Sequence, residues 1–261
     1  MAFKIGSTDF TKVYLGSTAI NNIQLGQSEV YSSFPVENDL KLRLEAADYP
    51  GSGSTWTDSA QSIDFTAYGT QTPYTTVGNA PCFDYNGSGY WQSGAGASSS
   101  DLVDMRGTFT LIILFYSQGL SVRKGLFEKA GTSYNSYEQE IAVTMETDET
   151  ASYYRGRSNY SYGDFNTATN NRWNFLAIKS EGTTVRTGHR WNQSGGSWVA
   201  DYTNRGNNAI TKAGAIRIGT GYKGPLTNGY IGSVLVYDRA LTTTEMSSLH
   251  THYSAIYDNL L

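Results

Sequence analysis

The stretch Gly229–Met246 (GYIGSVLVYDRALTTTEM) decides the fold of this 261-residue chain. Its segment Val234–Tyr237 is short, apolar and partly β-branched, as expected of a central strand that is covered on both faces. A helix is predicted directly afterwards, with Thr242 as N-cap and Glu245 as its partner in a reciprocal capping box. The stretch therefore predicts a buried strand followed by a capped helix.

Beyond the cap, apolar residues recur at three- and four-residue steps, which is the pattern of a helix that buries one stripe. Leu241, just before the cap, is expected to pack on Met246 as a hydrophobic staple. We therefore predict a terminal helix lying against the sheets, whose stripe consists of Met246, Leu249, Tyr253, Ile256 and Leu260.

The composition indicates an all-β protein. Twenty Tyr and 28 Gly stand against five Pro and four Met, which is typical of many short strands joined by tight turns. Phe109–Tyr116 and Trp173–Ile178 are nearly all apolar and predict central strands. Arg190–Tyr202 predicts a hairpin, and the turn Asn86–Gly89 between aromatic residues predicts another.

These segments together resemble a known family. The segment YDRAL (237–241), which precedes a capped helix, is similar to the end of concanavalin A-like, LamG-type jelly rolls. Further motifs follow in the order that such domains use: LKLRLEAADYPGSGSTWTDSA (40–60), CFDYNGSGYW (82–91), FTLIILFYS (109–117), GLFEKAG (125–131), RWNFLAIKS (172–180) and AIRIGTG (215–221). The resemblance implies an antiparallel jelly-roll β-sandwich over residues 35–261, with a C-terminal helix.

The first 31 residues carry an internal repeat with a ten-residue period, marked by Gly6, Gly16 and Gly26. Apolar residues stand at equivalent places before each glycine, and Gly-Ser-Thr triplets supply turns, so the pattern predicts a small β-meander. So short a segment buries too little apolar surface to be stable alone. It either packs on its own sandwich or docks on another subunit, and we favour docking through Phe3, Ile5, Val13, Leu15, Ile23 and Leu25.

The repeat carries a second resemblance. IGST (5–8), YLGST (14–18) and QLGQS (24–28), followed by EVY, are similar to N-terminal repeats of bacteriophage virion proteins of the tail fibre, baseplate or head decoration. Gln27 departs from the pattern of the first two copies. The resemblance implies that residues 1–34 attach the chain to other virion proteins and that a distal domain follows at Pro35.

Charge and cysteine content restrict the function further. A net charge of −4 with 19 basic residues gives no general footprint for nucleic acid. The lone Cys82 cannot form an internal disulfide, the N-terminus lacks a secretory signal, and no apolar run is long enough to span a membrane. We expect synthesis in the host cytoplasm, localisation in the virion, and a homo-oligomer, because an exposed meander with apolar rows should not remain solvated.

Catalytic and metal motifs are weak. Hydrolases of this sandwich usually carry Glu-x-Asp-x-Glu on one strand, and neither Glu138 with Glu140 nor the cluster Glu146, Asp148 and Glu149 matches that spacing. The sequence therefore predicts a protein that is not an enzyme.

The three histidines have no zinc spacing, so no metal site is predicted. Sandwich relatives often bind calcium through loop oxygens, and Asp48, Asp58 and Asp84 are available. Short Asp-rich turns are nevertheless commoner than calcium sites, and we predict no cofactor.

Aromatic residues supply the candidate binding site. In the stretch Tyr153–Asp164, tyrosines alternate with Arg, Asn and Asp, which suits either the C–H faces and hydroxyls of a sugar or a protein contact. Core packing of part of this cluster is the competing interpretation. The candidate glycan-binding residues are Trp56, Trp91, Tyr153, Tyr154, Arg155, Arg157 and Tyr160.

The sequence thus predicts a non-enzymatic virion protein whose outward, lectin-like sandwich contacts host surface polysaccharide. A free carbohydrate-binding lectin, a polysaccharide hydrolase, and a passive capsid decoration without a ligand remain as alternatives.

Overall fold

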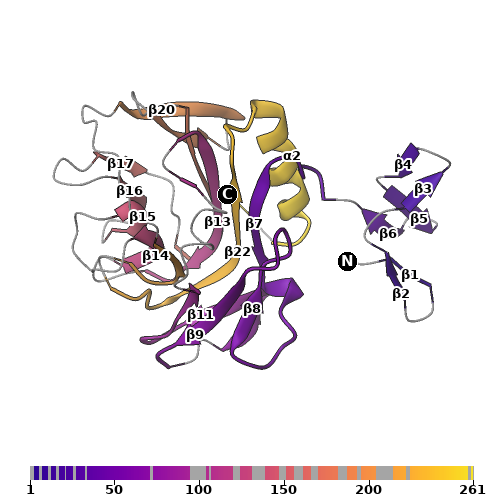
Figure 1. Cartoon of the computed structure of the whole chain (residues 1–261), viewed down its shortest axis with the longest axis horizontal. Coiled ribbons are helices and arrows are strands. Elements are labelled where there is room, and N and C mark those ends of the chain that lie inside the picture. The colour runs from indigo at the N-terminus through magenta and orange to yellow at the C-terminus, as the bar shows by residue number, and fades with distance from the viewer. Residues whose placement is uncertain are drawn as a thin grey trace. The chain divides into compact units, whose positions relative to one another are not determined.

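The structure is a computed structural model of the whole chain (Figure 1). It describes the backbone of residues 3–5, 8–10, 13–15, 18–20, 22–25, 28–32, 34–70, 73–94, 104–105, 107–119, 124–130, 139–146, 151–155, 161–165, 170–181, 187–192, 195–203, 214–221, 224–257 and 260. Side chains are described within these ranges from Phe34 onward, except at 130, 139–140, 154–155, 161–165, 187–188 and 201–203. The chain divides into two compact units, Met1–Glu37 and Asn38–Leu261.

In the described part of the first unit, the repeat forms three two-stranded sheets in place of one continuous meander. The hairpins are β1 (Phe3–Ile5) with β2 (Thr8–Phe10), β3 (Val13–Leu15) with β4 (Thr18–Ile20), and β5 (Asn22–Leu25) with β6 (Ser28–Ser32). Each copy of the repeat is therefore one hairpin. The predicted Gly-Ser turns lie outside the described residues.

The second unit is a β-sandwich of two antiparallel sheets, each eight-stranded over the described residues. Sheet I has the order β10 (Tyr74–Val77), β11 (Ala80–Tyr85), β22 (Gly229–Tyr237), β13 (Phe109–Ser117), β18 (Arg172–Ser180), β19 (Thr187–Asn192) and β20 (Ser197–Thr203), and β7 (Leu40–Glu45) also pairs with β22. The all-β prediction, the central strands and the β19–β20 hairpin are confirmed.

Sheet II forms the other layer, on the side of sheet I away from the helix (Figure 1). Its order is β17 (Ser161–Phe165), β16 (Ala151–Arg155), β15 (Gln139–Met145), β14 (Lys124–Ala130), β21 (Ala215–Ile218), β12 (Tyr90–Ser93), β9 (Asp64–Tyr68) and β8 (Thr55–Thr57). A short 3-10 helix, η1 (Ala46–Asp48), follows β7. The predicted hairpin at Asn86–Gly89 is wrong, because this turn carries the chain from β11 in sheet I to β12 in sheet II. Phe83 and Trp91 meet in the core, with ring centroids 5.0 Å apart.

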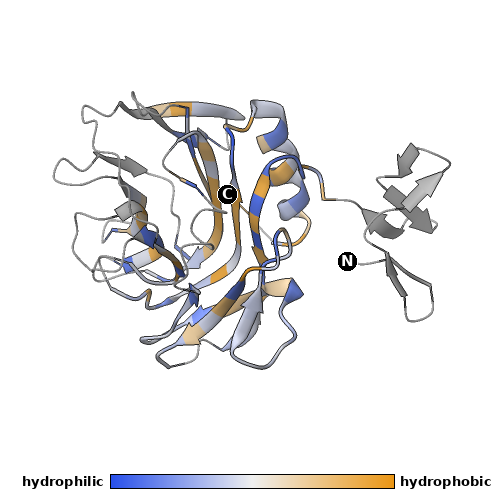
Figure 2. Ribbon diagram, viewed as in Figure 1, coloured by the Kyte–Doolittle hydropathy of each residue, from blue (hydrophilic) through white to orange (hydrophobic). Residues whose placement is uncertain are grey.

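Strand β22 is central to the sandwich, as predicted. It pairs with β13 along one edge, and along the other with β11 at Gly229–Ile231 and then with β7 at Ser233–Tyr237. Gly232 is an extra residue between the two halves, because Ile231 lies opposite Phe115 while Ser233 lies opposite Leu114. Apolar residues line the strands of both sheets around this strand (Figure 2).

Helix α2 (Thr243–Ser254) covers the outer face of sheet I and explains why β22 is apolar on both faces (Figure 1). Met246, Leu249 and Tyr253 are fully buried, as predicted. The predicted extension through Ile256 and Leu260 is wrong, since the helix ends at Ser254. Tyr257 continues the stripe instead, because its ring packs on Trp173 at 4.5 Å and its hydroxyl contacts Ser233 Oγ at 2.9 Å.

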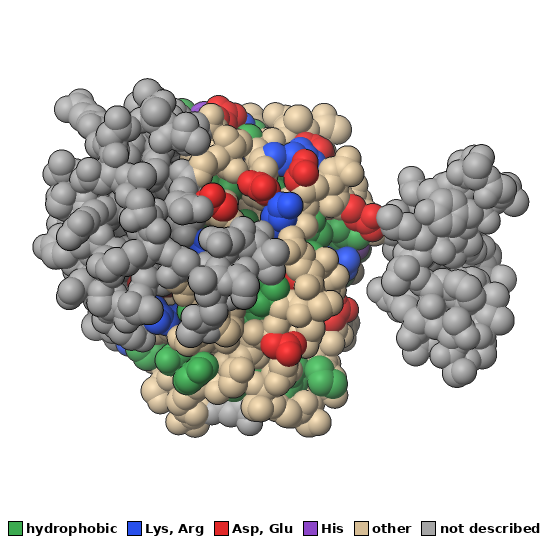
Figure 3. All heavy atoms as spheres, viewed as in Figure 1, with side chains coloured by type: hydrophobic (Ala, Val, Ile, Leu, Met, Phe, Trp, Pro, Cys, Tyr) green, Lys and Arg blue, Asp and Glu red, His purple; other side chains and the backbone are tan. Residues whose placement is uncertain are grey.

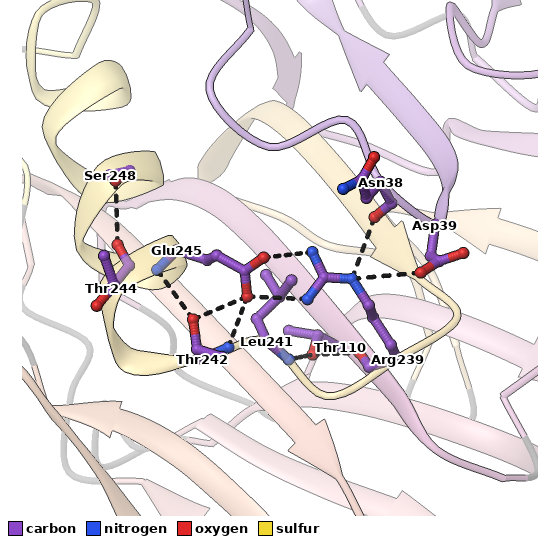
Figure 4. A network of polar contacts seen from close by, with 9 residues as sticks. All are labelled: Asn38, Asp39, Thr110, Arg239, Leu241, Thr242, Thr244, Glu245 and Ser248. Carbon is purple, nitrogen blue, oxygen red and sulfur yellow. Dashed lines mark hydrogen bonds and ion pairs between the residues drawn. The ribbon is translucent and has the colours of Figure 1, made fainter.

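The predicted capping box is present and belongs to a larger polar network (Figure 4). Glu245 accepts hydrogen bonds from the Thr242 amide at 2.9 Å and from both Arg239 Nη atoms, at 2.8 and 2.5 Å. Arg239 Nε also reaches the Asn38 carbonyl, at 3.2 Å, and lies 3.5 Å from an Asp39 carboxylate oxygen. The YDRAL segment thereby joins the helix start to the first residues of the sandwich.

A second network is buried under the helix. Arg43 donates two hydrogen bonds to Glu45, at 2.9 and 3.0 Å, and the Tyr253 hydroxyl donates a third at 2.7 Å. Burial by itself raises the pKa of Glu45, but the Arg43 guanidinium and the Tyr253 hydroxyl outweigh it and hold the pKa below its ordinary value. The carboxylate therefore remains ionised while it ties β7 to α2.

The Arg239–Glu245 contact predicts an acid-dependent loss of stability. Hydrogen bonds from Arg239, followed by those from Thr242, lower the pKa of Glu245 from 4.5 to about 2. The folded pKa is depressed, so the contribution is complete above the unfolded pKa and is lost as the pH falls towards about 2. Urea unfolding should show Glu245→Gln less stable than the parent at neutral pH and equal to it near pH 2; an equal difference at both pH values would contradict the assignment.

A matched pair of variants isolates the cap. Thr242→Ala removes the side-chain oxygen that accepts from the Glu245 amide and should cost about 1 kcal/mol. Thr243→Ala, one residue later on the exposed surface, should be nearly neutral in the same unfolding measurement.

Candidate functional site

Three of the aromatic residues predicted to bind glycan lie in the core. Trp56 and Trp91 have no exposed surface and Tyr153 is 1% exposed. Trp56 Nε1 donates to the Glu45 carbonyl at 3.0 Å, and its ring lies 4.7 Å from that of Phe83. A ring without exposed surface cannot stack on a sugar, so the prediction is wrong for these three residues.

The remaining predicted site residues stay predictions. Tyr154 and Arg155 belong to β16, where the backbone sets Tyr154 opposite Ala142 and Tyr162; their side chains lie outside the described set. Arg157 and Tyr160 lie outside the described residues. The attachment candidates Phe3, Ile5, Val13, Leu15, Ile23 and Leu25 fall on strands of the N-terminal hairpins, where only the backbone is described.

Two carboxylates at the β14–β15 pair, Glu128 and Glu146, each have their own side-chain partner. Glu128 is 2% exposed and accepts from Arg217 Nη1 at 3.1 Å, while Arg217 Nε donates to Gln92 at 2.8 Å. Glu146 is buried and accepts from the Thr144 hydroxyl at 3.0 Å. The other acids considered for catalysis, Glu138, Asp148 and Glu149, lie outside the described residues, and for Glu140 only the backbone is described.

The loop aspartates considered for calcium have separate roles. Both Asp58 oxygens accept backbone N–H groups, from Arg43, Ala60 at 3.2 Å and Gln61 at 2.6 Å, which closes the turn before β9. Asp84 accepts from Asn86 Nδ2 at 3.2 Å, and Asp48 is exposed at the end of η1. In the part of the chain that the structure describes, no group of three or more His, Cys, Asp or Glu residues could hold a metal ion.

A partly buried aromatic and polar surface lies elsewhere, on sheet I. Asp84 of β11 pairs with Tyr230 of β22, Tyr230 pairs with Tyr116 of β13, and Tyr116 pairs with Trp173 of β18. The four residues therefore form one row across four strands.

This row faces away from the sandwich core. Phe83, Ile231 and Phe115, which precede or follow the row on their strands, belong to the core between the sheets. Alternate residues of a strand face opposite sides, so Asp84, Tyr230 and Tyr116 lie on the outer face, where each is half-buried.

The tyrosine rings are held by a ladder of aromatic contacts. Tyr230 and Tyr116 lie 5.8 Å apart with their planes at 71°, and Tyr116 and Trp173 lie 5.7 Å apart at the same angle. Trp173, which is 2% exposed, packs in turn on the buried Tyr257. The partly buried rings of Tyr116 and Tyr230 thus pack on the buried rings of Trp173 and Tyr257, which restricts their movement.

Polar groups surround the two rings. Gln118 Nε2 donates to the Tyr230 hydroxyl at 3.4 Å. The backbone N–H of Gln118 donates to the Asn228 carbonyl at 3.0 Å, which fixes the position of this residue. Burial and the nearby Asp84 carboxylate raise the pKa of Tyr230, so its phenol stays neutral at physiological pH and can both donate and accept. Burial also raises the pKa of Asp84. We call Asp84, Asn86, Tyr116, Gln118 and Tyr230 the tyrosine surface.

This arrangement supplies flat apolar rings beside amide, hydroxyl and carboxylate groups, the combination that a sugar ring requires. The sequence interpretation missed it. The burial patterns of the two strands in the structure identify the site. Tyr116 is the one position of β13 that is not buried, and Tyr230 is the one position of β22 that is not buried. Only the strand register reveals that the two positions are neighbours.

Charge and membrane features give little further direction. On the face shown in Figure 3, the described acidic and basic side chains are interspersed. Among the helices that the structure describes, none is long and apolar enough to cross a membrane.

The fold defines the chain as a β-sandwich, and its likeness to known proteins lies in solved structures. No family model matches the sequence, and no curated protein matches it. Trypanosoma rangeli sialidase in complex with sialic acid is similar over 92% of this chain and 36% of that one, with 13% identity and a TM-score of 0.59. The same sialidase with a difluoro-KDN ligand gives a TM-score of 0.62 at 12% identity, covering 37% of that chain.

A second similar structure is that of botulinum neurotoxin type C, described as entering cells through interaction with two ganglioside molecules. The match covers 82% of this chain and 52% of that chain, with 11% identity and a TM-score of 0.59. The chain thus spans between a third and about half of these structures. At such identities the likeness shows the shared fold alone.

The burial of the tryptophans predicts a structural effect for their removal. Trp56→Ala and Trp91→Ala should each lower the free energy of unfolding by about 3–5 kcal/mol, because each leaves a large cavity in the core. Thermal unfolding followed by circular dichroism measures the effect. Selective loss of ligand binding in a variant of unchanged stability would restore a surface role for either residue.

Proposed function

We propose that this chain is a non-catalytic, glycan-binding β-sandwich of a bacteriophage virion, attached to the particle through residues 1–34. The single observation that carries glycan binding is the tyrosine surface, in which Tyr116 and Tyr230 stand 5.8 Å apart beside Gln118 and Asp84. The virion role is supported by the resemblance of the N-terminal repeat to phage proteins, and host surface polysaccharide is the ligand expected of such a protein.

Two properties favour a sugar as ligand. The partly exposed rings can stack on the C–H faces of a pyranose, while Gln118, Asn86, Asp84 and the Tyr230 hydroxyl offer donors and acceptors for its hydroxyls. The similar structures include proteins described with sialic acid and gangliosides, which supports the choice of glycans as first probes.

The arrangement of acids favours binding over hydrolysis. Glycoside hydrolysis usually needs two carboxyl groups about 5–10 Å apart. Glu128 of β14 lies opposite Ala142 of β15. Glu146 follows Ala142 by four residues, which is about 13 Å of backbone at strand spacing. Glu128 is also held by Arg217, whose Nη1 lies 3.1 Å from its carboxylate. Glu128 and Glu146 therefore do not form a matched pair.

The absence of catalysis is tested directly. Incubation with polysaccharides that the protein binds should release no reducing ends above the level of a heat-denatured sample. Release that disappears in Glu128→Gln or Glu140→Gln would overturn the non-catalytic assignment and favour the hydrolase alternative.

Ligand binding is tested on the tyrosine surface. We expect an array of bacterial surface polysaccharides and ganglioside glycans to show binding that falls about tenfold in Tyr230→Ala, the equivalent of about 1.4 kcal/mol. Gln118→Ala, at an exposed position, should weaken binding without changing stability. Calorimetric titration with the best array ligand measures both effects.

Tyr68→Ala is the matched control, because Tyr68 is 44% exposed but stacks on Tyr90 at 5.4 Å in sheet II. Loss of binding in Tyr68→Ala with no change in Tyr230→Ala would move the site to sheet II. Absence of binding across the array would favour the passive decoration.

A further inference from the structure

The three N-terminal hairpins have two edges each that no described strand occupies. β1–β2, β3–β4 and β5–β6 are separate two-stranded sheets, and within the described residues none of their strands pairs outside its own hairpin. An isolated two-stranded hairpin is marginally stable at best in water, and a free strand edge is a template for further pairing. Additional strands are therefore needed to stabilise the repeat.

The spacing of the hairpins restricts what can supply those strands. The first two hairpins have the same register, with Phe3 opposite Phe10 and Val13 opposite Ile20, one ten-residue period apart in sequence. A partner that pairs with every hairpin needs edges at the same period. A second copy of this chain has that period by construction, whereas an unrelated protein would need a matching repeat of its own.

The strand directions allow such pairing to close on itself. β1 and β2 are antiparallel, so β2 of one copy can pair antiparallel with β1 of the next, and likewise β4 with β3. This contact is head-to-tail, and a ring of copies leaves no free edge. The third hairpin differs, because its register shifts between Ile23 and Gln24 and β6 is five residues long. Such a bulge interrupts the regular ladder, so the third hairpin is suited to end the series of paired hairpins.

We infer that residues 1–32 are a self-association element, in which each hairpin pairs edge to edge with the same hairpin of neighbouring copies in a closed cyclic homo-oligomer. The oligomer so formed is the unit that attaches to the particle. It also presents several tyrosine surfaces together, which raises the effective affinity for a repeating polysaccharide without any new contact.

The experiment compares the full chain with a variant that lacks one period. Native mass spectrometry and sedimentation equilibrium at micromolar concentration should show a single closed oligomer for the full chain. The variant without residues 11–20 should still associate, more weakly. In this variant β5–β6 directly follows β1–β2, one period earlier than in the full chain. The two proteins therefore cannot align all their hairpins, and mixing them should yield mixed oligomers at no more than about a tenth of the statistical proportion.

Two outcomes would overturn the inference: a full chain that is monomeric at this concentration, or mixed oligomers in statistical proportion. A variant without residues 1–31 provides a second test, with circular dichroism to show that the sandwich is folded, and it should be monomeric. Persistence of the oligomer in this variant would place the contact on the sandwich. Binding of a single glycan by Tyr230 does not depend on these results, so the two proposals can fail separately.

Discussion

The burial of β22 on both faces is the constraint on which the sandwich depends. One face meets sheet II and the other meets α2, so the strand carries apolar residues at successive positions and pairs with three strands at once. A buried carboxylate in this layer needs partners close by, and Arg43 and the Tyr253 hydroxyl supply them to Glu45 beneath the helix. Gly232 allows the close approach of Tyr257, because a Cβ there would lie 2.4 Å from the Tyr257 hydroxyl.

The parts of the fold that could be predicted are those with local causes. A capping box involves residues three apart, and a nine-residue run that is nearly all apolar has few alternatives to a central strand. The turn Asn86–Gly89 was mispredicted because a hairpin and a crossover between layers present the same local pattern, aromatic residues on either side of a glycine-rich turn. The helix end was missed because Tyr257 is selected over Ile256 by Trp173 and Ser233, which are distant in sequence.

The candidate site shows the same limit more strongly. Sequence alternation indicates that neighbouring tyrosines face opposite sides but not which side is the core, and Trp56, Trp91 and Tyr153 proved to be inside. Tyr116 and Tyr230 are far apart in the chain and become neighbours only through the pairing of β13 with β22. Gln118, directly after β13, donates to the Tyr230 hydroxyl. Composition can therefore indicate the chemistry of a binding surface while the register decides where it lies.

The Arg239 network also has a mechanical consequence. Tension applied between residues 1–37 and a ligand held by the sandwich would enter the second unit at Asn38. There, Arg239 binds the Asn38 carbonyl and the Asp39 carboxylate, and the Asp238 amide donates to the Asp39 carbonyl at 2.9 Å. The force would act directly on the segment between β22 and α2. The contacts of Arg239 and Asp238 with Asn38 and Asp39 would therefore have to break together before β7 could separate from β22 one residue at a time.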